Sequence, residues 1–316
     1  MKAIRHAIRQ AATLCRLVQT HYLIAQTKAA GDHKEPVTIA DYGSQAIICR
    51  ALQRYYPDDA VVAEESGEQF MQLVAAEQRA QVRQLLAQVL GEPVSEAELV
   101  SWLDFGAGVS AHRTWVIDPI DGTKGFIARR HYVIACGLLL EGQVAEGVIA
   151  APGYRAGEGA LFYTQGGASW RAPLTSGRGE PVTVSQRNEV DEFVAVQSVE
   201  PTHASKSRMR LARERAGLGE VQVRELDSME KYALVACGDA DLYMRLPRPG
   251  SRYQHKIWDH AAGVALVQQA GGMVTGLDGG RLDFSRGDTL ANEGLIASNG
   301  RHHERVVEAV QQVMGE

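Results

Sequence analysis

Cysteine is scarce in this sequence, with 4 residues among 316. Cys15, Cys49, Cys136 and Cys237 lie far apart, and none belongs to a C-x-x-C pair or to a cysteine–histidine cluster with the spacing of metal ligands. This pattern argues against a thiolate metal site. We expect the four cysteines to be buried, reduced thiols and the protein to be cytoplasmic.

The sequence also lacks long hydrophobic runs and an excess of positive charge. Its longest apolar stretch, at 133–140, has about eight residues, whereas roughly twenty are needed to cross a bilayer. The 33 Lys and Arg against 38 Asp and Glu give a net charge of −5, which disfavours duplex nucleic acid as a partner. With 45% hydrophobic and 22% charged residues, the composition is typical of a globular protein. We expect neither a membrane nor a nucleic acid as a partner.

The first 31 residues contain neither an acidic residue nor a serine. Mitochondrial transit peptides share the lack of acid, but they are rich in serine. Ile4, Ile8 and Cys15 follow helical spacing, which favours a structural helix at the start of the chain. A targeting segment stays open as the alternative.

The chain shows no internal repeat and no low-complexity tract, and its length allows one large core or two domains. The stretch 68–100 is rich in Gln, Glu, Leu and Ala and is predicted to be helical, whereas apolar segments within 115–163 predict a meander of strands. Residues 166–190, rich in Gly, Pro, Ser and Arg, precede alternating strands and helices. We therefore expect an α+β domain at residues 1–175 and an α/β domain at 176–316.

The most informative segment has the sequence W-V-I-D-P-I-D-G-T-K-G-F. Asp118 and Asp121 leave the end of an apolar strand, and the intervening proline keeps Asp118 out of the helical conformation. Both carboxylates can point into one cleft, where they suit a hard divalent cation such as Mg²⁺. Gly122 and Thr123 then begin a helix whose free N–H groups can bind phosphate. Taken alone, the tetrapeptide fits an ordinary turn equally well.

Three further acids occupy comparable places. Glu64 follows a short apolar strand, Asp259 begins an apolar helix, and Asp41 precedes the helix after Pro36. Each on its own is typical of an acidic turn or of a helix cap. Their joint occurrence at the ends of buried elements favours one shared site.

The strings A-E-E-S at 63–66, D-P-I-D-G-T at 118–123 and W-D-H-A-A-G at 258–263 resemble those of the inositol monophosphatase-like phosphatases, which are Mg²⁺-dependent and Li⁺-sensitive. The strings S-x-E-x-x-H, S-x-x-K-Y, Y-x-R-L-P and K-I-W-D-H-A-A-G narrow the resemblance to the 3'(2'),5'-bisphosphate nucleotidases. The resemblance covers residues 37–300, except for 68–113. It implies an α/β protein with an α+β N-terminal half, folded as a layered αβαβα sandwich.

The resemblance also implies roles for individual residues. Two or three Mg²⁺ ions would be held by Glu64, Asp118, the carbonyl of Ile120, Asp121 and Asp259. The attacking water would be oriented and deprotonated by Asp41 and Thr123. The substrate would be bound by Gly122, Thr123, His203, Ser205, Ser228, Lys231, Arg245 and Lys256.

The implied activity is hydrolysis of the 3'-phosphate of adenosine 3',5'-bisphosphate, which yields AMP and phosphate. Two departures concern substrate preference: His255 stands where these nucleotidases usually have Glu, and Ala204-Ser205-Lys206 stands in place of a Ser-Ser run. An inositol mono- or polyphosphate phosphatase with the same metal core stays open, as does a catalytically silent nucleotide-sensing protein. A sugar bisphosphatase is a more distant alternative.

Overall fold

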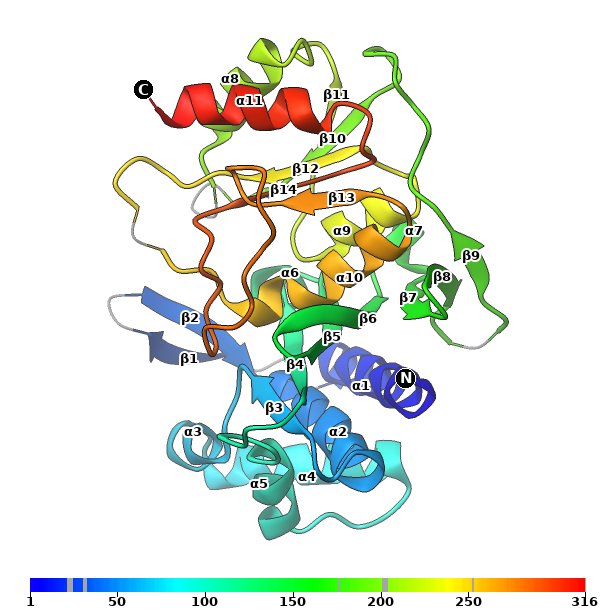
Figure 1. Cartoon of the computed structure of the whole chain (residues 1–316). Coiled ribbons are helices and arrows are strands. Elements are labelled where there is room, and N and C mark those ends of the chain that lie inside the picture. Colours follow the sequence, from blue (N-terminus) through cyan, green and yellow to red (C-terminus); the bar gives the residue numbers. More distant parts are fainter. Residues whose placement is uncertain (22–24, 31–32, 176, 201–203, 252, 316) are drawn as a thin grey trace.

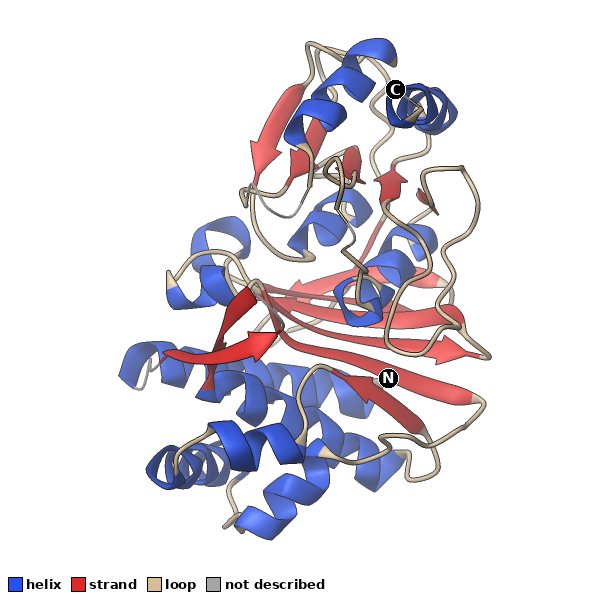
Figure 2. Cartoon of the chain, turned by 90° about the vertical axis from the view of Figure 1, so that its left-hand side faces the viewer, coloured by secondary structure: helices blue, strands red, loops and turns tan. Residues whose placement is uncertain are grey.

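The computed structural model describes the chain except for residues 22–24, 31–32, 176, 201–203, 252 and 316. Two sheets, one of seven strands and one of five, are stacked with helices between them and on both outer sides (Figures 1 and 2). A separate two-stranded sheet pairs β1 (Ala25–Ala30) with β2 (His33–Thr38). The mixed α/β class implied by the sequence is confirmed.

The seven-stranded sheet has the order β3-β4-β5-β6-β7-β8-β9. Only β3 and β4 run parallel, and every later pair is antiparallel, which confirms the predicted meander. Residues 166–190 contribute two strands to this sheet. The strands are β3 (Ala60–Ala63), β4 (Arg113–Asp121), β5 (Val133–Leu140), β6 (Gln143–Ala151), β7 (Ala160–Gln165), β8 (Ala168–Pro173) and β9 (Glu180–Val182).

The five-stranded sheet has the order β11-β10-β12-β14-β13. Strand β10 runs parallel to both of its neighbours, whereas β14 runs antiparallel to both of its own. The strands are β10 (Val194–Gln197), β11 (Gln222–Glu225), β12 (Leu242–Arg245), β13 (Met273–Thr275) and β14 (Leu295–Ser298).

Five helices belong to the N-terminal part: α1 (Lys2–His21), α2 (Ile39–Tyr55), α3 (Gly67–Leu73), α4 (Ala76–Leu90) and α5 (Glu96–Leu103). The predicted first helix is confirmed as α1. The predicted helical stretch 68–100 is divided into three helices. Gly91 ends α4 in the left-handed conformation, with φ at +77°, and Ser95 begins α5 by accepting a hydrogen bond from the Glu98 N–H.

The remaining helices are α6 (Thr123–Ile127), α7 (Tyr154–Gly157), α8 (Lys206–Arg215), α9 (Glu230–Ala236), α10 (Ala261–Gln269) and α11 (His303–Met314). The helix expected to begin at Asp259 starts two residues later, because Ile257–Asp259 form a separate 3₁₀ turn, η1. Asp259 therefore lies in a turn before α10.

Three hydrophobic cores lie between the layers, and the side chains of a strand alternate between two of them. On β4, Trp115 and Ile117 belong to the first core, with α1 and α2, whereas Val116 belongs to the middle core, with α9 and α10. On β10, Val196 belongs to the middle core and Ala195 to the third core, with α8 and α11. The layers run helix, sheet, helix, sheet, helix, as the resemblance implied.

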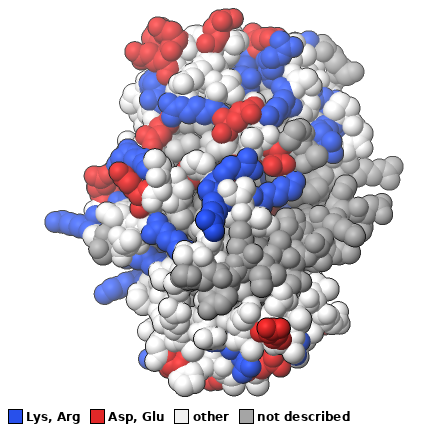
Figure 3. Space-filling view, turned by 180° about the vertical axis from the view of Figure 1, so that it is seen from behind, with Lys and Arg blue, Asp and Glu red and all other residues white. Residues whose placement is uncertain are grey.

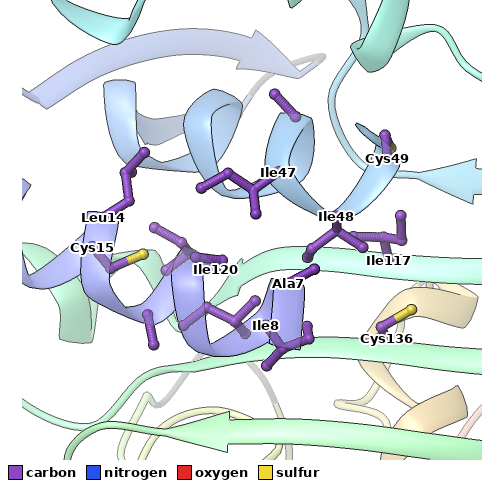
Figure 4. Packing of buried hydrophobic residues seen from close by; sticks show 14 of the residues in the cluster. Ala7, Ile8, Leu14, Cys15, Ile47, Ile48, Cys49, Ile117, Ile120 and Cys136 are labelled. Atoms are coloured by element: carbon purple, nitrogen blue, oxygen red, sulfur yellow. The ribbon is translucent and has the colours of Figure 1, made fainter. Parts of the chain in front are cut away.

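Helices α1 and α2 pack against each other on one side of the seven-stranded sheet. Ile8 of α1, Ile48 of α2 and Ile117 of β4 meet in the first core (Figure 4). This packing fixes α2, and with it Asp41, against the end of β4.

Helix α10 lies very close to the other side of the same sheet. A Cβ atom at Gly137 of β5 would lie 2.8 Å from the Cβ of Ala261, and one at Gly147 of β6 would lie 2.4 Å from the carbonyl oxygen of Ala262. Glycine at both positions therefore allows the helix to approach the sheet. The approach fixes the start of α10, next to Asp259, on β5 and β6.

All four cysteines are free thiols. Cys15, Cys49 and Cys136 are buried, as expected from the sequence. Cys237 is only partly buried, because it lies at the end of α9, where its Sγ is 3.9 Å from the hydroxyl of Tyr154. The expectation of a fully buried thiol is wrong at this position.

The surface carries charges of both signs. Viewed from behind, acidic and basic side chains are interspersed in the upper part of the molecule, and Lys and Arg gather near its middle (Figure 3). Ion pairs such as Arg210–Glu214 and Lys206–Glu225 join opposite charges. Within the described part of the chain, no helix is long and apolar enough to cross a membrane.

Candidate active site

Strand β4 contains an irregularity that brings Asp118 and Asp121 to the same side of the sheet. Asp118 pairs with Ala135 of β5, and Asp121 pairs with Val133, with a register shift between the two pairs. Three residues of β4 thus span two residues of β5. In a regular strand, residues three apart point to opposite sides, and the extra residue of a bulge reverses this relation. The two carboxylates therefore share one side, as the sequence predicted.

Glu64 is brought beside Asp118 by strand pairing. Strand β3 runs parallel to β4, with Ala63 opposite Ile117, so the residues that follow this pair are Glu64 and Asp118. The acidic pair after the short strand is therefore adjacent to the bulge of β4.

Helix α2 holds both acidic segments in place. Asp41, Ser44 and Gln45 lie on one buried side of this helix, three and four residues apart. The Ser44 hydroxyl donates to the carbonyl of Pro119 at 3.0 Å. The Gln45 amide donates to the carbonyl of Glu65 at 2.6 Å and accepts from its N–H at 2.9 Å. Helix α2, which carries Asp41, is thus hydrogen-bonded to the backbone of both acidic segments.

Asp118 lies at the centre of an acidic group. Its side chain is buried, and its Oδ1 has no hydrogen-bond partner among the described residues. Burial raises the pKa of Asp118 well above its ordinary value, and the negative charges of Glu64, Asp121, Asp259 and Asp41 raise it further. These carboxylate oxygens repel one another and are of the kind that a hard divalent cation prefers. The donor set therefore fits Mg²⁺.

Protein donors already engage two of these carboxylates. Asp121 accepts a hydrogen bond from the N–H of Met229, and Asp259 lies with its Oδ2 3.6 Å from Nη1 of Arg245. In the part of the chain that the structure describes, no group of three or more His, Cys, Asp or Glu side chains is already arranged to hold a metal ion. Cation binding would therefore require the carboxylates around Asp118 to move closer together.

The turn after Asp121 is fixed by close packing. Gly122 has φ at +88°, a conformation that favours glycine, and a Cβ atom there would lie 3.2 Å from the Cβ of Ser228. Thr123 begins α6, and its hydroxyl donates to the carbonyl of Ile120 at 3.2 Å. The expected ligand Ile120, the expected catalytic Thr123 and the expected substrate residues Gly122 and Ser228 are thus neighbours.

Two basic side chains lie near the acidic group. Lys231 is buried, and its Nζ donates to the carbonyls of Leu226 and Ser228 at 3.3 and 2.6 Å. Burial lowers the pKa of Lys231 to about 8. Arg245 is largely buried, and its Nε has no hydrogen-bond partner among the described residues. Burial raises the pKa of Asp121, and the charges of Lys231 and Arg245 oppose that rise.

Two other expected substrate residues, Ser205 and Lys256, have different surroundings. Ser205 begins α8, and its Oγ accepts a hydrogen bond from the N–H of Arg208 at 3.3 Å, as an ordinary helix cap does. The Nζ of Lys256 donates to the carboxylate of Asp288. His203 lies outside the described residues. The substrate roles of these three residues stay predictions.

The sequence analysis missed Ser44, Gln45 and the Met229 N–H. The two side chains carried a usable signal, because fully buried polar residues three and four positions after Asp41 have to be hydrogen-bonded. The Met229 contact carried none, since it is made by a backbone group that every residue except proline has.

Comparisons with known proteins agree with this architecture. A model of the inositol monophosphatase family matches residues 2–315. A 3'(2'),5'-bisphosphate nucleotidase of Emericella nidulans is 36% identical over 92% of this chain and 92% of that protein, and one of Oryza sativa is 34% identical over 100% and 94%. The IMPase of Thermotoga maritima shares the fold, with a TM-score of 0.68 and 22% identity over 98% of this chain and 96% of that chain. The chain belongs to the inositol monophosphatase family.

Proposed function

We propose that this protein is a Mg²⁺-dependent 3'(2'),5'-bisphosphate nucleotidase, which hydrolyses the 3'-phosphate of adenosine 3',5'-bisphosphate to give AMP and phosphate. The observation that carries the proposal is the group of carboxylates around the buried Asp118. The substrate class is supported by the two bisphosphate nucleotidases that match nearly the whole chain.

The acidic group would hold two or three metal ions. The ligands would be Glu64, Asp118, the carbonyl of Ile120, Asp121 and Asp259. When bound, Mg²⁺ supplies positive charge against the phosphoryl oxygens and makes water more acidic. The Ile120 carbonyl has a second lone pair and Asp121 has a second oxygen, so both could face the cation while they keep their present protein donors.

Asp41 and Thr123 would prepare the attacking water. The Thr123 hydroxyl donates its proton to the Ile120 carbonyl at 3.2 Å, so its oxygen can accept a hydrogen bond from water and orient it. Asp41 would then accept the water's proton as the general base. Asp41 is among the charges that act on Asp118, which supports its place in the site.

The nucleotide would be held by donors around the start of α9. A bisphosphate brings two anionic groups, of which one is at the metals, so the other needs positive charge elsewhere. Lys231 and Arg245 supply such charge, although the whole chain has a net charge of −5. Gly122 and Ser228 would contribute from the packed turn, and His203, Ser205 and Lys256 complete the proposed set.

We also propose a division of the chain into two units, residues 1–175 and 176–316. The seven-stranded sheet belongs to the first unit except for β9, which begins at Glu180 and pairs with β8, and the five-stranded sheet belongs to the second. Asp259 would come from the second unit and the other metal ligands from the first. The site would therefore lie where the two units meet.

The test measures phosphate released from adenosine 3',5'-bisphosphate, inositol 1-phosphate and fructose 1,6-bisphosphate, each with Mg²⁺ and with excess EDTA. We expect Mg²⁺-dependent release that is fastest from the nucleotide. Faster release from inositol 1-phosphate would replace this proposal with an inositol phosphate phosphatase. Nucleotide binding by a folded protein without any phosphate release would indicate a nucleotide-sensing protein.

A further inference from the structure

A series of buried polar side chains leads away from the turn that carries Asp259. The hydroxyl of Tyr232 lies 2.8 Å from Nδ1 of His260. Nε2 of His260 lies 3.3 Å from Nδ1 of His255. Nε2 of His255 lies 3.1 Å from the carbonyl oxygen of Glu293. Tyr232, His260 and His255 are 1%, 0% and 3% exposed, so the three side chains satisfy one another away from bulk water.

The last acceptor determines the direction of every hydrogen bond in this series. A carbonyl oxygen only accepts, so Nε2 of His255 carries a proton. In a neutral imidazole the other nitrogen accepts, so Nδ1 of His255 accepts from Nε2–H of His260. By the same rule Nδ1 of His260 accepts from the Tyr232 hydroxyl. Both imidazoles are thereby held in the Nε2–H tautomer.

The surroundings of His255 favour this neutral form. Burial, together with the positive charge of Arg245, lowers the pKa of His255 to about 3. A reversed tautomer at either histidine would place two protons or two lone pairs against each other and leave buried polar atoms unsatisfied. The direction of the series is therefore unique for uncharged imidazoles.

One end of the series lies on the helix that also contacts Asp121. Tyr232 belongs to α9, and the N–H of Met229, just before α9, donates to the Asp121 carboxylate. The Tyr232 hydroxyl contacts His260, which follows Asp259 directly in the chain. Met229, which caps α9, thus contacts Asp121, and Tyr232 of α9 is hydrogen-bonded to His260, the residue next to Asp259.

Both ends of the series are fixed by packing or by backbone hydrogen bonds. A Cβ atom at Gly263 would lie 2.4 Å from the Tyr232 ring, so this ring is packed directly against the backbone of α10. At the other end, the N–H of Leu290 donates to the carbonyl of His255 at 2.7 Å. The side chains between these ends have little freedom to reorient.

We propose that Tyr232, His260 and His255 are positioning residues that set Asp259 at the right place relative to Asp121. The inference rests on the proposed function in taking both carboxylates as metal ligands. His255 continues the series by offering both an acceptor and a donor. Asp259 would be held through its neighbour His260.

The first test reads the tautomers in metal-free protein. Protein labelled with ¹⁵N-histidine is examined near neutral pH by long-range ¹H–¹⁵N correlation, which distinguishes Nδ1–H, Nε2–H and doubly protonated imidazole. We expect His255 and His260 to be neutral Nε2–H tautomers. An Nδ1–H tautomer or a positive charge at either residue would overturn the proposal.

The second test uses Tyr232→Phe, which keeps the ring against Gly263 and removes only the hydroxyl donor. We expect His255 and His260 to keep the Nε2–H tautomer in this variant, because the Glu293 carbonyl sets it from the other end. We also expect the Mg²⁺ concentration for half-maximal activity to rise about tenfold, as when an outer partner of a metal ligand is lost. At saturating Mg²⁺, the KM for the nucleotide should change by less than about twofold, because the hydroxyl does not bind substrate.

Two variants of His255 show whether its hydrogen bonds position Asp259 or whether its side chain only fills space. His255→Gln offers an amide oxygen to His260 and an amide N–H to Glu293, so it should keep the Mg²⁺ requirement within about threefold of the wild type. His255→Ala offers neither, so it should raise the Mg²⁺ requirement as Tyr232→Phe does, and it should also leave His260 with a mixture of tautomers. Tyr132→Phe is the matched control, because it removes a buried tyrosine hydroxyl that contacts Gln19 at 3.4 Å, outside the series.

An unchanged Mg²⁺ requirement in Tyr232→Phe would overturn the proposal, and Tyr232→Phe alone decides the case if His255→Ala does not fold. Calorimetric titration with Mg²⁺ compares the Mg²⁺ affinity of the wild type and the variants without substrate. A wild-type protein that releases no phosphate would therefore contradict the proposed function, whereas the tautomers and Mg²⁺ binding would still test the positioning residues.

Discussion

The Ser44 hydroxyl of α2 donates a hydrogen bond to the Pro119 carbonyl in the bulge of β4, at 3.0 Å. Proline cannot donate to a neighbouring strand, and the register shift frees its carbonyl from the sheet, so the helix supplies the partner. This single contact connects the helix of Asp41 with the segment between Asp118 and Asp121.

Replacing Ser44 should therefore affect stability and catalysis together. Ser44→Ala leaves the buried Pro119 carbonyl without its donor, which should lower the free energy of unfolding by about 1 to 3 kcal/mol. A looser bulge should also lower kcat more than it raises KM. Urea unfolding and steady-state kinetics measure both effects. Thr13→Ala, which removes an exposed hydroxyl bonded within α1, should change neither.

Replacing Asp121 tests the metal site. Asp121→Asn keeps the size of the side chain and can still accept from the Met229 N–H, but it removes one negative charge from the proposed cation site. We expect Mg²⁺-dependent phosphate release to fall by at least about a hundredfold, with thermal unfolding little changed. Near-normal turnover by the folded variant would exclude Asp121 from the ligands.

The Thr123 hydroxyl is expected to act on water rather than on substrate. Thr123→Ala should lower kcat much more than it raises KM, because an oriented water is needed only for the chemical step. Thr123→Ser keeps the hydroxyl and should recover most of the activity. If KM alone changes, Thr123 serves only in binding or in beginning α6.

Replacing the basic residues near the site should slow hydrolysis of the bisphosphate more than hydrolysis of smaller substrates. Lys231→Met and Arg245→Ala should each lower kcat/KM for adenosine 3',5'-bisphosphate by about ten- to a hundredfold, since one charge-assisted hydrogen bond is worth about 1.5 to 3 kcal/mol. Hydrolysis of a small monophosphate should change much less. Lys256→Ala should have a smaller effect, because Asp288 already engages that ammonium group. Equal losses on both substrates would assign the residues to the fold.

His303 should make stability depend on pH away from the site. Its ring nitrogens contact the hydroxyls of Ser298 and Thr275 at 2.8 and 2.9 Å, and burial lowers the pKa of His303 to about 4. The unfolded chain protonates near pH 6.5, before the native state does, so stability is lost as the pH falls from about 6.5 to 4, by on the order of 3 kcal/mol.

His303→Gln should remove this part of the pH dependence. Urea unfolding at several pH values would show a shallower loss of stability for His303→Gln than for the wild type. His112→Gln, at an exposed histidine, should keep the wild-type slope. The same slope in all three proteins would contradict the assignment.

Much of the fold was predictable because the sequence patterns that indicate its helices and strands lie within single segments of the chain. Ile4 and Ile8 recur at helical spacing in α1, and the long apolar strands β5 and β6 are separated by the Glu141-Gly142 turn. The grouping of carboxylates around Asp118 could be expected for a similar reason, since each carboxylate stands in a short string at the end of a strand or the start of a helix.

The remaining elements depend on contacts between distant segments. Strand β14 has four residues, Leu295–Ser298, and is stabilised by pairing with β12 and β13. Such a short run has no periodicity of its own. The surroundings of Lys256 were unpredictable for the same reason, because Asp288 belongs to a segment whose approach is set by the fold.

The middle core has a consequence for how the chain unfolds. It contains Val116 and Val133 from the seven-stranded sheet together with Val196 and Ala297 from the five-stranded sheet, and α10 lies between them. A chain cut after residue 175 would leave β5 and β6 without the helix that packs on Gly137. Neither fragment would then retain its apolar surface in the interior. We expect the two halves to melt in one cooperative transition and to aggregate when expressed separately.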